Sequence, residues 1–215
     1  MGGRKGVRRS RQRAGPPRAG GREPVGLRIV GGEFRRRKLL YHGDPRVRPM
    51  KDRLRESLFN LVGPSVRQKH AVDLFAGTGA LALEAISRGA AGATLIERHL
   101  PTVALVRRNV AGLGVEPLCD LVAADVFDWA ERQTLPQEEA WIVFSSPPYD
   151  FYVERTDAMV GLIGRLMAAS PTESVFVVES DERFDFGLLP DAEAWRVRRY
   201  RPAVLGIWRK PAEAE

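Results

Sequence analysis

From residue 71 onward the chain alternates short apolar runs with helical stretches, and this alternation constrains the fold more than any other feature. Apolar runs of strand length occupy residues 71–75, 93–96, 118–123, 141–144 and 174–178. Residues 80–88, 101–111 and 153–168 have helical periodicity. Repeated strand–helix units predict an α/β fold with a mostly parallel sheet, right-handed crossovers and helices on both faces. The last two runs, 196–200 and 203–208, predict a closing antiparallel hairpin.

The basic residues are concentrated at the N-terminal end. Residues 1–26 contain eight Lys or Arg against one acidic residue, and residues 27–55 contain ten against three. The remaining 160 residues contain 16 against 23, so a basic front end precedes a mildly acidic body. This asymmetry indicates a polyanionic partner that is held through its phosphates.

Composition divides the chain into three parts. Residues 1–26 are rich in Gly, Pro and Arg, and we expect a disordered basic tail there. We expect residues 27–62 to form an RNA-facing extension of a strand or hairpin plus a helix, and residues 63–215 to form the main domain.

Several classes of protein find no support in the composition. No apolar run approaches the ~20 residues that span a bilayer, so we expect no membrane association. The single cysteine, Cys119, and the three histidines show no metal-ligand spacing, so we expect no metal site. We expect a cytoplasmic protein that acts as a monomer.

A glycine loop follows the first predicted parallel strand. It reads Asp73-Leu-Phe-Ala-Gly77-Thr-Gly79, and its glycines let the backbone turn tightly and approach a ligand. Glu97 ends the second strand, where a carboxylate can accept hydrogen bonds from ribose hydroxyls, and Asp125 ends the third. The three strand ends predict a ligand site along one edge of the sheet.

Two cofactors compete for this arrangement. Residues 77–82 also fit the G-x-G-x-x-A pattern of dinucleotide sites, which would make the protein a nucleotide-dependent reductase. However, Asp73 would repel a pyrophosphate and attract a cationic sulfonium that carries an ammonium group. The loop therefore favours S-adenosylmethionine.

A second loop, Ser145-Ser146-Pro147-Pro148-Tyr149, follows the fourth predicted strand and resembles the loop that binds the target base in amino-group methyltransferases. An exocyclic amine is a poor nucleophile because its lone pair is delocalised into the ring. Hydrogen bonds from its N–H groups to a side-chain oxygen and to the Pro147 carbonyl would draw the nitrogen toward tetrahedral geometry. The two prolines fix that carbonyl, and Tyr149 offers a face for an unstacked base.

Two N-terminal blocks, residues 27–39 and 48–60, closely resemble the RsmD family of bacterial small-subunit (16S) rRNA methyltransferases, which modify guanine at N2. Together with the two loops, the resemblance covers roughly residues 27–210. It implies a Rossmann-like methyltransferase fold with a seven-stranded sheet, and as partner the small-subunit rRNA or an assembling 30S particle.

The resemblance also implies roles for particular residues. The catalytic loop would comprise Ser146, Pro147, Pro148 and Tyr149. The residues expected to hold S-adenosylmethionine are Asp73, Phe75, Gly77, Gly79, Glu97, Asp125 and Val126. The residues expected to contact RNA are Arg35, Arg36, Arg37, Lys38, Arg46, Arg48 and Arg53.

The chain departs from the family pattern at three positions. The family usually has Gly at the place of Arg36, Thr at that of Met50 and Asp at that of Ser146. Serine lacks the charge that would strengthen a bond to the amine, so we expect slower transfer than in an Asp-bearing relative. Serine is also typical of DNA cytosine-N4 methyltransferases, which leaves that activity as one alternative. A ribosome-assembly RNA-binding protein with weakened methyltransferase activity is another.

Overall fold

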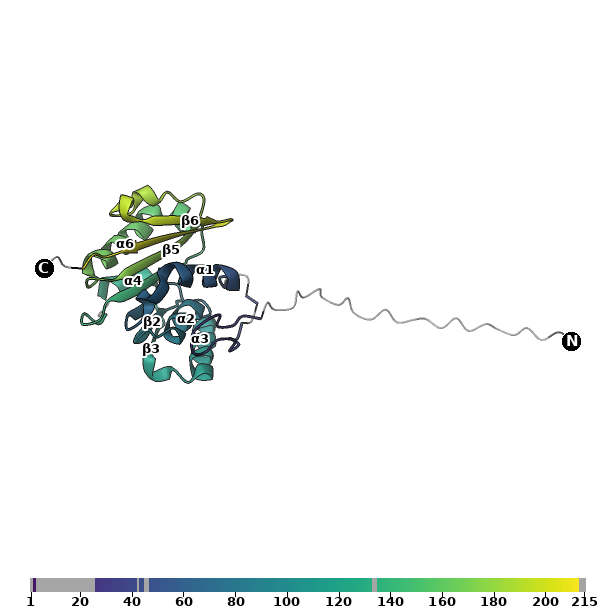
Figure 1. The fold of residues 1–215 in the computed structure, drawn as a ribbon. Coiled ribbons are helices and arrows are strands. Elements are labelled where there is room, and N and C mark those ends of the chain that lie inside the picture. Colours follow the sequence, from purple (N-terminus) through teal and green to yellow (C-terminus); the bar gives the residue numbers. More distant parts are fainter. Residues whose placement is uncertain (1, 3–25, 42, 45–46, 133–134, 213–215) are drawn as a thin grey trace.

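The computed structural model describes residues 2, 26–41, 43–44, 47–132 and 135–212, and its centre is a seven-stranded sheet (Figure 1). The strand order is β3-β2-β1-β4-β5-β7-β6. The strands are β1 (His70–Asp73), β2 (Gly92–Ile96), β3 (Cys119–Val122), β4 (Trp141–Ser145), β5 (Val175–Asp181), β6 (Arg196–Tyr200) and β7 (Ala203–Arg209).

The first five strands are parallel, and β7 lies antiparallel between β5 and β6. The chain builds outward from β1 to β3 and then returns to place β4 on the other side of β1. The strand order therefore reverses between β1 and β4, which is where open α/β sheets bind ligands. The predicted Rossmann-like fold, with its mostly parallel sheet and closing antiparallel hairpin, is confirmed.

Helices cover both faces of this sheet (Figure 1). The α-helices are α1 (Asp52–Val62), α2 (Ala80–Ser87), α3 (Leu100–Leu113), α4 (Val126–Arg132), α5 (Phe151–Glu154) and α6 (Thr156–Ala169). Short 3-10 turns are η1 (Gly63–Val66), η2 (Glu116–Leu118), η3 (Phe186–Leu188) and η4 (Ala192–Ala194). Helices α1, α2 and α3 pack on one face in one hydrophobic cluster, and α4, α5 and α6 pack on the other face in a second cluster.

The N-terminal extension is bound to α2 and α3 by side chains. A hairpin is predicted over residues 27–30 and 38–41, but the structure forms one antiparallel bridge, between Arg28 and Lys38. Backbone bonds flank this bridge, from the Ile29 N–H to the Arg37 carbonyl at 2.9 Å and from the Leu39 N–H to the Leu27 carbonyl at 2.8 Å. The N–H groups of Val30 and Gly31 donate to Glu84, and that of Leu40 donates to Asn109, so side-chain acceptors in the main domain hold the short paired segments.

Two helices differ from the predicted pattern. The predicted helix over 153–168 is two helices, α5 and α6, because Arg155 leaves the helical region with φ of −132°. The hydroxyl of Thr156 donates to the Tyr152 carbonyl 2.8 Å away, which occupies an acceptor that a continuous helix would use. The sequence reading also missed α4, whose first turn is capped by Asp125 accepting from the Phe127 N–H at 3.0 Å.

The predicted tail falls almost entirely outside the described residues. Within the described part of the chain, none of the helices combines the length and the apolar character needed to cross a membrane.

Candidate active site

The two loops that the sequence singles out lie side by side at the carboxyl edge of the sheet. Asp73, the last residue of β1, pairs in register with Phe144 of β4, and the loop from Ser146 to Tyr149 begins two residues after Phe144. Neighbouring strands are about 4.8 Å apart, so the topology brings the glycine loop and the proline loop together.

The glycine loop has the backbone that its sequence requires. Gly77 and Gly79 have φ of 52° and 77°, in the left-handed region that favours glycine. An added Cβ at Gly79 would lie 3.2 Å from Val106 and 3.3 Å from Leu95. The loop is fixed from outside by buried Asn109, whose amide nitrogen donates to the Thr78 carbonyl at 2.9 Å.

Asp73 is almost fully buried, with 1% of its surface exposed. Its Oδ2 accepts from the Ala82 N–H at 3.3 Å, and its buried Oδ1 lacks a hydrogen-bond partner among the described residues. Burial, with a smaller contribution from the nearby charge of Glu97, raises the pKa of Asp73 to about 7. A carboxylate held in this way would be stabilised by a positively charged ligand.

The other predicted cofactor residues lie along the same edge. Glu97 is half-buried, and it accepts from the Gly77 N–H at 3.0 Å and from the His99 N–H at 2.8 Å, which ties the end of β2 to the glycine loop. Asp125 follows β3 and pairs with exposed Arg98 at 3.5 Å. Val126, the first residue of α4, is buried, so its side chain belongs to the core.

Half-buried Phe75 lies between the glycine loop and α5. Its ring meets that of Phe151 edge-on, with 5.9 Å between the ring centroids. The aromatic contact links the segment after β1 to the helix after the proline loop.

Within the proline loop, Pro147 is buried, Pro148 is exposed, and Ser146 and Tyr149 are half-buried. Ser145 belongs to β4 and bonds Tyr152 of α5, with 2.9 Å between the two hydroxyl oxygens. The loop is therefore anchored on both sides while Ser146 and Tyr149 remain partly accessible.

Glu179 of β5 is a site residue that the sequence reading missed. Its carboxylate accepts from both Ser146 and Tyr149, the latter at 2.8 Å, although the glutamate is only 6% exposed. Burial raises the pKa of Glu179, and the two hydroxyl bonds partly offset this effect. The sequence did hold a signal, because Glu179 directly follows the apolar run 174–178, as Asp73, Glu97 and Asp125 follow or end theirs.

Segment 47–48 of the N-terminal extension reaches this edge. A Cβ added to Gly77 would lie 3.3 Å from Val47, so this segment packs against the glycine loop. The charge of exposed Arg48 acts on Tyr149 and opposes the rise that burial and Glu179 cause in the pKa of its phenol.

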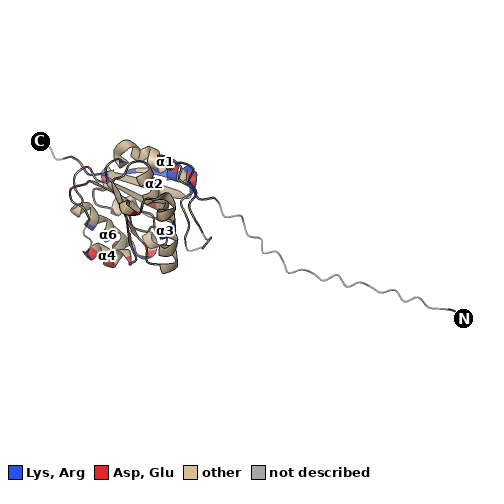
Figure 2. Cartoon of the chain, turned by 90° about the horizontal axis from the view of Figure 1, so that it is seen from below, with Lys and Arg blue, Asp and Glu red and all other residues tan. Residues whose placement is uncertain are grey.

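The remaining residues predicted to contact RNA lie on the surface of the extension and of α1. The exposed members of this group are Arg35, Arg36, Arg37, Lys38 and Arg53. Arg37 donates to the Gly112 carbonyl at 2.6 Å, and Arg36 has φ of 71°. Figure 2 shows basic positions on α1. The prediction for Arg46 lies outside the described residues.

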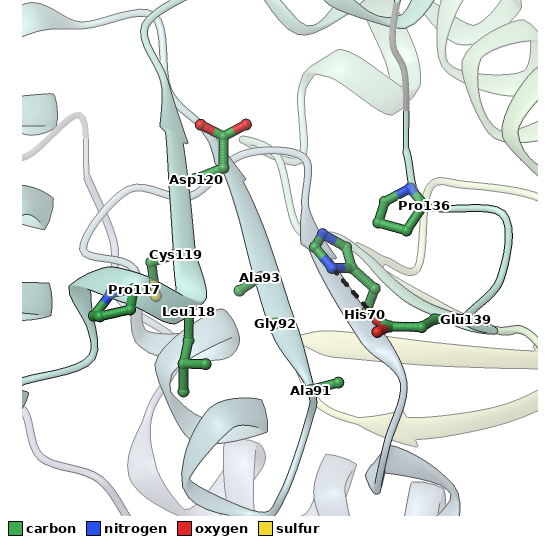
Figure 3. Close-up of a pocket in the computed structure, with 10 residues that line it drawn as sticks. All are labelled: His70, Ala91, Gly92, Ala93, Pro117, Leu118, Cys119, Asp120, Pro136 and Glu139. Carbon is green, nitrogen blue, oxygen red and sulfur yellow. Dashed lines mark ion pairs between the residues drawn. The ribbon is translucent and has the colours of Figure 1, made fainter.

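A hollow lies at the opposite edge of the sheet, where β1, β2 and β3 begin (Figure 3). His70, Asp120 and Glu139 line it, and His70 Nδ1 is 4.0 Å from Glu139 Oε2. Burial lowers the pKa of His70. None of the predicted site residues lines this hollow. Among the described residues, no group of three or more His, Cys, Asp or Glu could hold a metal ion.

Comparison with known proteins gives a family match over most of the chain. The model of the family described as "Conserved hypothetical protein 95" matches residues 27–205. Over 123 residues, the chain is 40% identical to "Ribosomal RNA small subunit methyltransferase D" of Escherichia coli (strain K12). That alignment covers 57% of this chain and 60% of the relative, so the chain spans less than two thirds of the curated relative.

Solved structures match more of the chain. A structure described as "Putative methyltransferase yhhF from Escherichia coli" has a TM-score of 0.72 and 30% identity, covering 87% of this chain and 99% of that one. A 16S rRNA N2 methyltransferase of Thermus thermophilus, solved with AdoMet and guanosine, has a TM-score of 0.64 and 21% identity. It covers 86% of this chain and 49% of that one, and at this identity the likeness concerns the fold.

Proposed function

Because the chain belongs to the family described as "Conserved hypothetical protein 95", we propose that it transfers a methyl group from S-adenosylmethionine to the exocyclic N2 of a guanine in small-subunit ribosomal RNA. The family match and the curated relatives confirm the resemblance to the RsmD family that the sequence motifs indicated. The substrate and the target atom are part of the proposal.

The observation that carries the proposal is the adjacency of the two loops across β1 and β4. The register of Asp73 with Phe144 brings the glycine loop next to the Ser146–Tyr149 loop. Methyl transfer in a single displacement requires the donor and the accepting nitrogen to be held in line, and positioning of this kind supplies much of the rate of such a reaction. A cofactor loop beside a base-binding loop meets that requirement.

The donor set fits S-adenosylmethionine. Among the residues that the structure describes, the buried Oδ1 of Asp73 lacks a hydrogen-bond partner, and a carboxylate in that state favours a cation. Glu97 offers an acceptor for ribose hydroxyls, and Asp125 lies at the end of the neighbouring strand. Phe75, Gly77 and Gly79 would shape the walls of the same site, and Val126, whose side chain belongs to the core, would meet the cofactor only through its backbone.

When bound, the cofactor supplies an electrophilic methyl group: the amine lone pair forms the new N–C bond, the C–S electron pair remains on sulfur, and one amine proton leaves to water. In the protein, Ser146 Oγ and the Pro147 carbonyl would accept hydrogen bonds from the amine N–H groups. These bonds strengthen as positive charge develops on nitrogen, which stabilises the transition state. Pro148 stiffens the loop, and the ring of Tyr149 would support the base.

The basic extension would hold the RNA. Arg35, Arg36, Arg37 and Lys38 are exposed on one turn, Arg48 is exposed and its charge acts on Tyr149, and Arg53 is exposed on α1. Phosphate contacts of this kind position a substrate without reading its sequence. In this proposal residues 27–62 face the RNA, residues 63–215 carry the chemistry, and the protein acts as a monomer on rRNA or an assembling 30S particle.

The test is to incubate the purified protein with radiolabelled S-adenosylmethionine and, in parallel reactions, small subunits from a strain that lacks the modification or unmethylated DNA. We expect label in the small-subunit rRNA. The Asp73→Asn variant, which keeps the side chain's size and removes its charge, should transfer no label. Label that enters DNA alone would support a cytosine-N4 methyltransferase instead, and no label in either substrate would contradict the proposal.

A further inference from the structure

Glu179 and Ser146 stand on neighbouring parallel strands in a register that brings their side chains together. Ser145 of β4 pairs with Val178 of β5, so the next residues of each strand, Ser146 and Glu179, follow side by side. The Ser146 hydroxyl donates to Glu179 Oε2, and the Tyr149 hydroxyl donates to Glu179 Oε1 at 2.8 Å. One buried carboxylate therefore holds both polar side chains of the proline loop.

We propose that Glu179 is a positioning residue for methyl transfer: it accepts a hydrogen bond from the Ser146 hydroxyl, so that the Ser146 oxygen faces the target amine as an acceptor. This inference rests on the proposed function. It assigns to β5 the negative charge that the family's usual aspartate carries at the place of Ser146.

The physical reason lies in the inventory of a hydroxyl group. A serine hydroxyl has one donor and two acceptor lone pairs, and an unassisted hydroxyl is free to turn its proton toward the amine. When a carboxylate holds that proton, both lone pairs remain available to accept. A hydrogen bond to an ionised group is roughly twice as strong as a neutral one, so Glu179 also makes the serine oxygen more electron-rich.

The same carboxylate fixes the ring of Tyr149 through its hydroxyl. This bond leaves the ring's face available for stacking and restricts rotation of the loop. The charge that serine lacks is therefore supplied by Glu179, which removes the reason to expect slower transfer with serine. Ser146→Asp would instead place two carboxylates in contact, and the pair would hold a proton that the wild-type site does not hold.

The charged and titratable groups around Glu179 come from several elements. Tyr149 lies in the loop after β4 and Tyr152 lies in α5, while Asp181 of β5 and Arg48 of the extension act on Tyr149 from further away. Burial of Glu179 raises its pKa above the ordinary value. Because Glu179 must be ionised to accept two protons in hydrogen bonds, the transfer rate should fall as the pH falls through that raised pKa.

The experiment uses the full chain, radiolabelled S-adenosylmethionine and small subunits that lack the modification. Single-turnover rates are measured from pH 5 to 8.5 for wild type, Glu179→Gln, Ser146→Ala and the double variant, with S-adenosylmethionine saturating at every pH so that the titration of Asp73 does not enter the rate. Cofactor affinity is measured by calorimetry and folding by thermal denaturation. Glu139→Gln, at the opposite edge of the sheet, is the matched control and should behave as wild type.

We expect Glu179→Gln to lower the rate at pH 8 at least tenfold, to leave the Kd for S-adenosylmethionine within twofold, and to remove the fall in rate at low pH. In the Ser146→Ala background, Glu179→Gln should lower the rate less than threefold, because the serine hydroxyl that Glu179 positions is already absent. A wild-type rate in Glu179→Gln, or the same loss in both backgrounds, would overturn the inference.

If Glu179→Gln does not fold, the Ser146→Ala variant tests the inference by itself. A tenfold lower rate with a flattened pH profile supports the inference, and a rate within twofold of wild type overturns it. A wild-type protein that labels nothing would instead contradict the proposed function.

Discussion

The guanidinium of Arg55 in α1 lies 3.6 Å from the carboxylate of Glu84 in α2, and both side chains are completely buried. Burial lowers the pKa of Arg55, and the charge of Glu84 opposes that effect most strongly. Glu84 also accepts from the backbone N–H groups of Val30 and Gly31 and from Arg88, each at 2.8 Å. This pair joins the N-terminal extension to the body of the sheet.

Replacing Glu84 by Ala should therefore be strongly destabilising. The change leaves Asp52, 2.9 Å away, as the remaining anionic partner of buried Arg55, and it removes the acceptor shared by Arg88 and two partly buried backbone N–H groups. We expect a cost of about 3–5 kcal/mol in the free energy of unfolding. Urea denaturation measures it. The matched control is Glu56→Ala on the exposed side of α1, which should stay within about 0.5 kcal/mol of wild type. Equal stability of the two variants would show that the pair does not hold the extension.

The ionised Asp73 carboxylate should lower the free energy of unfolding, although the same charge would bind the cationic cofactor. Its pKa is raised to about 7, so the ionised form is disfavoured in the folded protein, and the stability present below the ordinary pKa is lost as the pH rises through about 7. Asp73→Asn should therefore raise the free energy of unfolding at pH 8 by about 1–3 kcal/mol, and much less at pH 4.5. Denaturation at both pH values tests this, and a variant that is less stable than wild type at pH 8 would contradict it.

The same raised pKa predicts pH-dependent cofactor binding. A cationic ligand favours the ionised form, and below pH 7 binding must first remove the Asp73 proton. Affinity for S-adenosylmethionine should weaken roughly tenfold between pH 8 and pH 5.5. Calorimetry in wild type and in Asp73→Asn measures it. An affinity that is independent of pH, or a variant that binds as well as wild type, would remove Asp73 from the site.

Gly79 and Gly112 should respond oppositely to alanine. Gly79 has φ of 77°, and an added Cβ would press against Val106 and Leu95, so Gly79→Ala should cost about 1–3 kcal/mol and weaken cofactor binding. Gly112 lies in α3 with open space around its Cα, so Gly112→Ala should raise stability by up to about 1 kcal/mol. Thermal denaturation compares them, and losses of similar size at the two positions would argue against a specific need for glycine in the loop.

Arg36 has the left-handed backbone conformation where the family usually has Gly, with φ of 71°. Arg36→Gly relieves strain of roughly 1 kcal/mol, which the greater freedom of glycine in the unfolded chain partly offsets, so stability should be unchanged or slightly higher. Binding to small-subunit rRNA should nevertheless weaken, with a shallower dependence on salt.

The control for Arg36→Gly is Arg165→Ala on α6, an exposed residue on the other side of the sheet, which should leave RNA affinity unchanged. Filter binding at several salt concentrations measures both variants. RNA affinity that falls equally in the two would mean that the contact is general electrostatic attraction rather than a bond at this turn.

Local sequence patterns predicted those helices and strands whose type depends mainly on the residues within the element itself. The apolar runs and the glycine after Asp73 identified the parallel strands and the edge at which the loops meet. They did not predict the break at Arg155, which depends on a hydroxyl bond between Thr156 and Tyr152.

The anchoring of residues 27–40 was not predictable either, because Glu84 and Asn109 lie 53 to 69 residues further along the chain than the backbone groups they bind. The same limit applies to Glu179. Its position after a strand was visible, but its contact with Ser146 depends on the register of β4 with β5.

The central claim is methyl transfer to guanine N2 of small-subunit rRNA, and its most direct measurement is nucleoside mass spectrometry of rRNA from a strain that lacks the gene. We expect one N2-methylguanosine to be missing from the small-subunit rRNA of that strain. Wild-type protein with S-adenosylmethionine should restore it, and Asp73→Asn should not. Unchanged N2-methylguanosine in that strain, or restoration by the variant, would contradict it.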